Sequence, residues 1–182
     1  TTHAGECTND GWNINWHACE SACEQAIKNN LPLLIFGPAF SFLHWLDSTV
    51  TFHKLPRESR IMETGGYKGR SRVLAKNEFH ELLSKRLGIP KSHIACEYGM
   101  CELNSQAYDR QIDFDKERVF RFPHWAQPII INPETGNPCG EGEIGLLRII
   151  DLANVYSSVA IQTQDLARSV SNGFELLGRD RT

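Results

Sequence analysis

Helical and strand-like stretches alternate along the first hundred residues, and this alternation limits the folds that the chain can adopt. Apolar side chains recur at helical spacing in some stretches, whereas others are short runs of almost wholly apolar residues. The expected helices span residues 16–29, 40–46 and 76–87, and the expected strands span 33–36, 61–63 and 93–96. Helices between successive buried strands are typical of a parallel sheet. We therefore expect an α/β fold that begins with a parallel sheet with helix cover.

The pattern changes after residue 108, where a charged stretch leads into segments that are typical of strands. Strands are expected at 119–122, 128–131, 144–150, 159–163, 166–170 and 174–177. Asn172 and Gly173 separate the last two apolar runs, and Asn-Gly at such a place favours a hairpin. We expect an α/β subdomain over residues 1–115, followed by a mostly antiparallel β subdomain over 116–182. Residues 1–15 are polar and rich in turn formers, and are expected to be poorly tied down.

Composition and charge argue against several classes of partner. The 182 residues are 41% hydrophobic and 23% charged, as in ordinary globular proteins. Their net charge of −3 gives no electrostatic reason to bind nucleic acid or an anionic membrane. No apolar run approaches the roughly 20 residues of a transmembrane helix, and the polar start does not resemble a signal peptide. We expect no nucleic-acid partner, no transmembrane segment and a cytoplasmic location.

The six cysteines allow a disulfide framework or a set of reduced thiols. The chain is too long for a disulfide framework to be the default. Cys19, Cys23 and Cys96 lie within apolar patterns, where a reduced cysteine packs as a small apolar side chain. His17 with Cys19 and Cys23 also suggests zinc, but no fourth ligand follows at finger-like spacing. A core stripe in a reducing compartment is the favoured interpretation.

Residues 96–106 carry the clearest sign of chemistry. The carboxylates of Glu97 and Glu102 lie on either side of a Tyr-Gly pair, directly after an expected strand. Loops at the carboxyl ends of strands are where open α/β sheets bind ligands. Residues 64–69 form a second such loop, with three glycines that let the backbone approach a flat ligand closely. That loop is not a Walker loop, which needs Gly-Lys-Ser/Thr at the start of a helix.

Residues 97–102, Glu-Tyr-Gly-Met-Cys-Glu, resemble the Tyr-Gly-x-Thr-Glu signature of adenylate-forming enzymes. The next residues, 103–108, are similar to the acyl-protein synthetase branch of these enzymes. Residues 63–66, Glu-Thr-Gly-Gly, match the glycine pair that lies beside the adenine in this superfamily. Residues 161–166 resemble its Thr-Gly-Asp-Leu segment, with Gln164 in place of Gly, and 174–179 resemble its Gly-Arg segment. Four segments in the family's order are far more specific than any one alone.

The resemblance implies ATP and Mg²⁺ as cofactors and assigns roles to single residues. Glu102 would bind the metal, and Cys101 stands where the family has a Thr that donates to the AMP phosphate; a thiol is a weaker donor. Asp165 would accept hydrogen bonds from the ribose hydroxyls, and Arg179 would meet the ribose before a hinge near Asp180 or Arg181. The implied catalytic residues are Cys101 and Glu102, and the implied nucleotide-binding residues are Gly65, Gly66, Tyr67, Glu97, Tyr98, Gly99, Met100, Asp165 and Arg179.

The function that the resemblance implies is ATP-dependent activation of a carboxylic acid, above all a fatty acid, with transfer of the acyl group to a thiol. The acceptor would be a partner protein, such as a reductase, or CoA. An aryl- or acyl-CoA ligase of the same superfamily and a non-catalytic nucleotide-binding module remain alternatives. The family's phosphate loop is expected upstream of Thr1, and its C-terminal domain, with a catalytic Lys and an acceptor Cys, downstream of Thr182. The chain is thus expected to be an internal piece of a longer enzyme.

Overall fold

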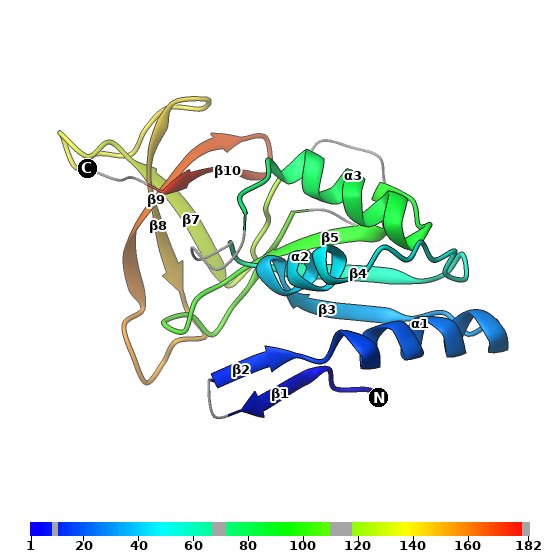
Figure 1. Cartoon of the computed structure of the whole chain (residues 1–182). Helices are drawn as coiled ribbons and strands as arrows, with labels where there is room; N and C mark the ends of the chain where they lie inside the picture. Colours follow the sequence, from blue (N-terminus) through cyan, green and yellow to red (C-terminus); the bar gives the residue numbers. More distant parts are fainter. Residues whose placement is uncertain (9–10, 67–71, 110–117, 180–182) are drawn as a thin grey trace. The chain divides into compact units, whose positions relative to one another are not determined.

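The computed structural model describes residues 1–8, 11–66, 72–109 and 118–179, and the chain divides into two compact units (Figure 1). The first unit is Thr1–Ala95 and the second is Cys96–Thr182. The seam expected between residues 115 and 116 lies outside the described residues, and the two units divide instead between Ala95 and Cys96. Hydrogen bonds explain this, because the Asp109 N–H donates to Cys96 O at 3.0 Å and the Val119 N–H donates to Asp109 O at 2.9 Å. Both sides of the expected seam thus belong to one hydrogen-bonded structure.

The first unit has the expected helices and strands. Its helices are α1 (Trp16–Asn29), α2 (Ala39–Ser48) and α3 (Lys76–Leu87), with a short 3₁₀ helix η1 (Lys91–His93). Strand β3 (Leu34–Pro38) pairs in parallel with β4 (Arg60–Thr64), and the hydrogen-bonded order is β3-β4-β5-β6. Strand β5 (Ile94–Tyr98) crosses into the second unit, where β6 (Ala107–Tyr108) pairs with it antiparallel. The α/β fold class is confirmed.

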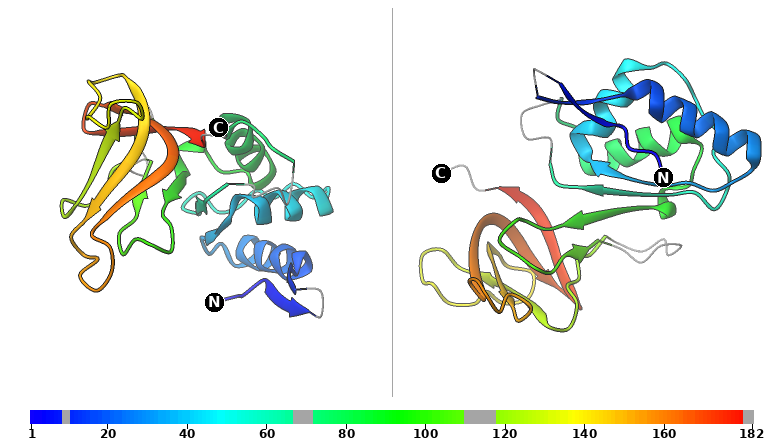
Figure 2. Two further views of the ribbon diagram at one scale, coloured as in Figure 1. Left: turned by 90° about the vertical axis from the view of Figure 1, so that its left-hand side faces the viewer. Right: turned by 90° about the horizontal axis from the view of Figure 1, so that it is seen from below.

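The helices of the first unit gather on one side of its strands (Figure 2). They enclose an apolar core that includes Leu43, Ile61, Phe79 and Leu83. The expectation that residues 33–36 form a fully buried strand is wrong on one face. Leu34 and Phe36 are more than half exposed, because β3 lies at the edge of the sheet and the helices cover only its other face.

The start of the chain is more ordered than its composition indicates. Strands β1 (Gly5–Thr8) and β2 (Gly11–Ile14) pair antiparallel, so the expectation of an untied segment is wrong. The ladder satisfies backbone groups that a polar segment would otherwise leave to water. Asn15 then caps α1, because its side-chain oxygen accepts a hydrogen bond from the Ala18 N–H at 2.9 Å.

The second unit is built on an antiparallel sheet with the strand order β10-β9-β8-β7 (Figure 2). Its strands are β7 (Ala126–Ile131), β8 (Ile144–Asp151), β9 (Ala160–Val170) and β10 (Gly173–Arg179). The Asn-Gly hairpin between β9 and β10 is confirmed, and Asn172 takes the positive φ of 64° that such a turn requires. The two strands expected over 159–170 are one continuous strand. Residues 119–122 contribute only isolated bridges, which include Phe120 with Phe174.

No helix in the described part of the chain is both long enough and apolar enough to cross a membrane.

Candidate functional site

The loop that carries the Tyr-Gly motif follows β5 in the second unit. A turn forms at its start, where the Leu103 N–H donates to Met100 O at 3.1 Å. Leu103 is buried and Met100 packs against the core of the unit, whereas the side chains of Cys101 and Glu102 are exposed. The apolar residues of the loop are therefore packed in the core, and the two predicted catalytic side chains are exposed to solvent.

Asp151, the last residue of β8, and Asn154, in the connection to β9, hold this loop. The Asp151 carboxylate is fully buried and accepts hydrogen bonds from the Asn104 N–H at 3.0 Å and from the Ser105 hydroxyl at 2.7 Å. The side chain of Asn154, 3% exposed, donates to Glu102 O at 2.7 Å. Sequence reasoning missed Asp151 and Asn154. The only available signal was a pair of polar residues directly after an apolar strand, which is common at turns.

Three predicted nucleotide-binding residues come together on β5, β9 and β10. The Tyr98 hydroxyl donates to Asp165 Oδ2 at 2.7 Å, and Arg179 Nε lies 3.8 Å from Asp165 Oδ1. The Asp165 N–H also donates to Thr163 Oγ1 at 3.0 Å, which fixes the backbone that carries the carboxylate. The structure thus brings together residues from three of the four segments in which the resemblance was seen, namely 97–102, 161–166 and 174–179.

The ring of Tyr98 belongs to the core of the second unit. It makes edge-to-face contacts with Phe120, Phe122 and Phe174, and the residue is 8% exposed. Burial, the hydrogen bond to Asp165 and its negative charge raise the pKa of Tyr98 well above the ordinary value. The phenol therefore stays protonated and acts as a donor to the carboxylate.

Gly99 and Glu97 are packed closely together. A Cβ on Gly99 would lie 2.6 Å from Glu97 Oε1 and 3.3 Å from Gln106 Cγ. Glu97 itself is half-buried. A side chain at position 99 would therefore displace the Glu97 carboxylate.

The glycine-rich loop follows β4 in the first unit. Gly65 has a φ of +67°, which favours glycine, but a Cβ on Gly65 or Gly66 would meet no atom within 4 Å. The requirement at Gly65 is thus for a backbone conformation and not for space. The predicted adenine neighbour Tyr67 lies outside the described residues, as do Lys68 and Gly69 and the hinge positions Asp180 and Arg181.

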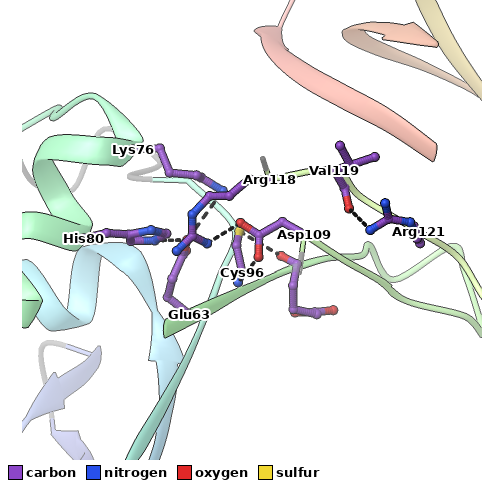
Figure 3. Close-up of polar contacts among 9 residues, drawn as sticks. Glu63, Lys76, His80, Cys96, Asp109, Arg118, Val119 and Arg121 are labelled. Carbon is purple, nitrogen blue, oxygen red and sulfur yellow. Dashed lines mark hydrogen bonds and ion pairs between the residues drawn. The ribbon is translucent and has the colours of Figure 1, made fainter. Parts of the chain in front are cut away.

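Each unit also buries a carboxylate beside a strand end (Figure 3). In the first unit, Glu63 Oε1 lies 3.0 Å from His80 Nε2 and 3.4 Å from Lys76 Nζ. In the second unit, Asp109 accepts from the Cys96 N–H at 2.7 Å and pairs with Arg118. These carboxylates are compensated by cations and N–H groups, as buried charges must be. Asp109, at the start of the charged stretch, is thus buried and ion-paired.

The thiols take the places that the apolar pattern predicts. All six cysteines are free, and Cys23 and Cys96 lie in the two cores. Burial above all raises the pKa of Cys23 to about 12. Within the described part of the chain, no cluster of three His, Cys, Asp or Glu side chains could hold a metal ion.

The fold and these motif residues define a class, the adenylate-forming enzymes. MatB from Rhodopseudomonas palustris, solved with ATP bound, shares the fold with a TM-score of 0.62 at 17% identity, over 88% of this chain and 33% of that one. MenE from Bacillus subtilis, solved with ATP and a magnesium ion, gives a TM-score of 0.58 at 20% identity, over 87% of this chain and 34% of that one. The fold that the resemblance implies is thus confirmed.

The chain belongs to the family described as Acyl-protein synthetase, LuxE, which it matches over residues 17–173. It is 29% identical over 148 residues to a long-chain-fatty-acid–luciferin-component ligase of Aliivibrio fischeri. That match covers 77% of this chain and 37% of the relative, so the chain spans little more than a third of the relative's length. The family is one of adenylate-forming ligases, and the resemblance seen in the sequence is confirmed.

Proposed function

We propose that the full-length protein containing this chain activates a fatty acid as an acyl-adenylate and passes the acyl group to a thiol. The observation that carries the proposal is the meeting of Tyr98, Asp165 and Arg179, which come from segments far apart in the sequence. The match to the acyl-protein synthetase family supports the acyl-activating chemistry. The Aliivibrio relative, a ligase of long-chain fatty acids by its name, favours a fatty acid.

The ribose of the nucleotide would be held by residues of the second unit. Asp165 is a carboxylate whose orientation is set by Tyr98, and such a group accepts hydrogen bonds from two neighbouring ribose hydroxyls. Arg179, largely exposed on β10, would meet the ribose from the same side. Glu97, Gly99 and Met100, which belong to the same unit, would frame the adenine.

Glu102 fits Mg²⁺ by its chemistry. Magnesium is usually held by one or two carboxylates together with substrate phosphates and water, and Glu102 offers one exposed carboxylate on an anchored backbone. When bound, the ion would offset the charge that develops on the phosphates as a carboxylate oxygen attacks the α-phosphorus and pyrophosphate leaves. Cys101 would offer its thiol where the family offers a hydroxyl.

The overall reaction would be tested by carboxylate-dependent exchange of labelled pyrophosphate into ATP, with the full-length gene product and a panel of fatty and aromatic acids. Exchange with fatty acids is expected. Exchange with aromatic acids alone would favour a CoA ligase, and no exchange by a folded protein would favour a nucleotide-binding module. Adding CoA or a candidate reductase then identifies the acyl acceptor. The free thiols support a reducing, cytoplasmic location.

The metal assignment has its own variant. Glu102→Gln should abolish acyl-adenylate formation while leaving the fold unchanged, because the amide keeps the shape of the side chain and loses its charge. Glu134→Gln, which removes an exposed carboxylate from the turn after β7, is the matched control and should retain exchange. Unchanged exchange by Glu102→Gln would contradict the assignment.

A further inference from the structure

Asp151, at the end of β8, and Asn154, in the connection between β8 and β9, together hold three residues of the motif loop: Glu102, Asn104 and Ser105. Asp151 Oδ2 accepts from the Asn104 N–H at 3.0 Å, and Asp151 Oδ1 accepts from the Ser105 hydroxyl at 2.7 Å and from the Ala153 N–H at 3.1 Å. One buried carboxylate therefore joins both loops. Because this carboxylate is fully buried, these hydrogen bonds replace the water that it loses on folding.

Asn154 adds three hydrogen bonds to this network. Its Nδ2 donates to Glu102 O at 2.7 Å and to Ser158 O at 2.8 Å, and its Oδ1 accepts from Asn104 Nδ2 at 2.9 Å. Trp125 Nε1 donates to Ser105 Oγ at 3.0 Å and adds a contact from outside the connection. The backbone of Glu102 and Asn104 and the hydroxyl of Ser105 are thus held by side chains some fifty positions later in the chain.

The side-chain carboxylate of Glu102 and the backbone carbonyl group of the same residue have different surroundings. The carbonyl oxygen is held by Asn154, whereas the exposed carboxylate has no hydrogen-bond or ion-pair partner among the described residues. The position of this carboxylate therefore depends on the backbone of the loop. Asn154 and Asp151 hold that backbone in place.

We infer that Asp151 and Asn154 are positioning residues for the Glu102 carboxylate, and that the end of β8 and the connection that follows it set the affinity of the site for its divalent cation. The inference rests on the proposed function, in which Glu102 binds Mg²⁺. Partners that orient a metal ligand typically change metal affinity 10–100-fold when they are lost. Asn154 donates to the backbone carbonyl of Glu102, the proposed metal ligand. Its loss should therefore weaken binding of the metal more than binding of the fatty acid.

The test uses Asn154→Ala in the full-length protein. The half-saturating Mg²⁺ concentration for pyrophosphate exchange should rise about tenfold, whereas KM for the fatty acid should change less than twofold. Electron paramagnetic resonance of Mn²⁺, titrated in the presence of ATP without the acid, should show the same weakening independently of turnover. Asn132→Ala is the control, because the Asn132 side chain also holds a turn of the second unit, by accepting from the Glu134 N–H at 2.9 Å.

Trp125→Phe is a milder second variant, in case Asn154→Ala does not fold. It removes only the bond to Ser105 and should raise the half-saturating Mg²⁺ concentration about twofold, less than the loss of a full partner. Unchanged metal dependence in a folded Asn154→Ala, or an equal change in Asn132→Ala, would overturn the inference.

The Glu102 variant separates this inference from the proposed function. If Glu102→Gln weakens Mn²⁺ binding and Asn154→Ala does not, the positioning role alone fails. If Glu102→Gln leaves Mn²⁺ binding unchanged, the metal assignment fails. In the double variant Glu102→Gln with Asn154→Ala, the second change should add no further loss of Mn²⁺ affinity, because Asn154 acts through Glu102.

Discussion

The loop after β4 and the loop after β5 each follow a strand and each carry predicted nucleotide-binding residues, but they are built differently. At the start of the first loop, Gly65 supplies a positive φ and the surrounding space is open. The second loop is held by Asp151, Asn154 and Trp125 through hydrogen bonds to its backbone and to Ser105.

The two loops differ in whether nearby or distant residues determine the conformation of their backbone. A glycine sets the backbone direction by itself, whereas the second loop depends on residues brought to it by the antiparallel sheet. Groups that must meet a metal or a developing charge need a fixed geometry, which a supporting network supplies. The comparison predicts that changes around the second loop cost more than changes in the first.

The largest effect is expected for Asp151→Ala. Removing this buried acceptor leaves two N–H groups and a hydroxyl without their partner, and should lower the free energy of unfolding by about 3 kcal/mol. Urea denaturation followed by circular dichroism measures the loss. Asp47→Ala removes a half-exposed carboxylate paired with Arg72 and should cost less than about 1 kcal/mol. Equal losses in the two variants would break the comparison.

Gly65→Ala should have the largest effect within the first loop. The left-handed backbone conformation costs a residue with a Cβ about 1 kcal/mol, although the open space admits the methyl group. The free energy of unfolding from urea denaturation should fall by that amount. Gly66→Ala is the control, because Gly66 has no positive φ and equally open surroundings, and it should be neutral. A larger loss at Gly66 would show that packing controls this loop.

Tyr98→Phe tests the hydrogen bond between Tyr98 and Asp165, which joins β5 to β9 and belongs to neither loop. Loss of the hydrogen bond to Asp165 should lower the free energy of unfolding by about 1 kcal/mol at pH 7. Because the pKa of Tyr98 is raised in the folded state, its stabilisation is present below the ordinary tyrosine pKa, about 10, and is lost as pH rises above it. Thermal unfolding at pH 8 to 11 should show a shallower alkaline loss in Tyr98→Phe. Parallel profiles would contradict the prediction.

The smallest effect on stability is expected for Cys101→Thr, below about 0.5 kcal/mol, because the side chain is exposed on a loop held through its neighbours. The same exposure makes Cys101 accessible to alkylation. Iodoacetamide should modify Cys101 well before Cys23, whose burial and raised pKa of about 12 keep the thiol protonated. Mass spectrometry of the labelled peptides measures the order. Faster labelling of Cys23 would show that the core of the first unit opens readily.

Much of the fold could be predicted because the signals are local. Helical periodicity predicted α1 and α3 with the bounds that the structure has, and Gly88 ends α3 with a φ of +67°. The Asn-Gly pair predicted the β9–β10 hairpin. The motif residues were recognisable from their order along the chain. Turn chemistry and side-chain spacing act over a few residues, so they can be recognised without knowing the fold.

The sequence alone thus determined the elements, the class of fold and the segments that carry chemistry. Only the tertiary structure decided that Tyr98 reaches Asp165, that Asp151 and Asn154 hold the loop of Glu102, and that one face of β3 stays open. These pairings join residues about fifty or more positions apart, and they depend on the register of β8 and β9, which shifts between Leu146 and Arg148. No local pattern encodes a register shift, because it is settled by the packing of the whole sheet.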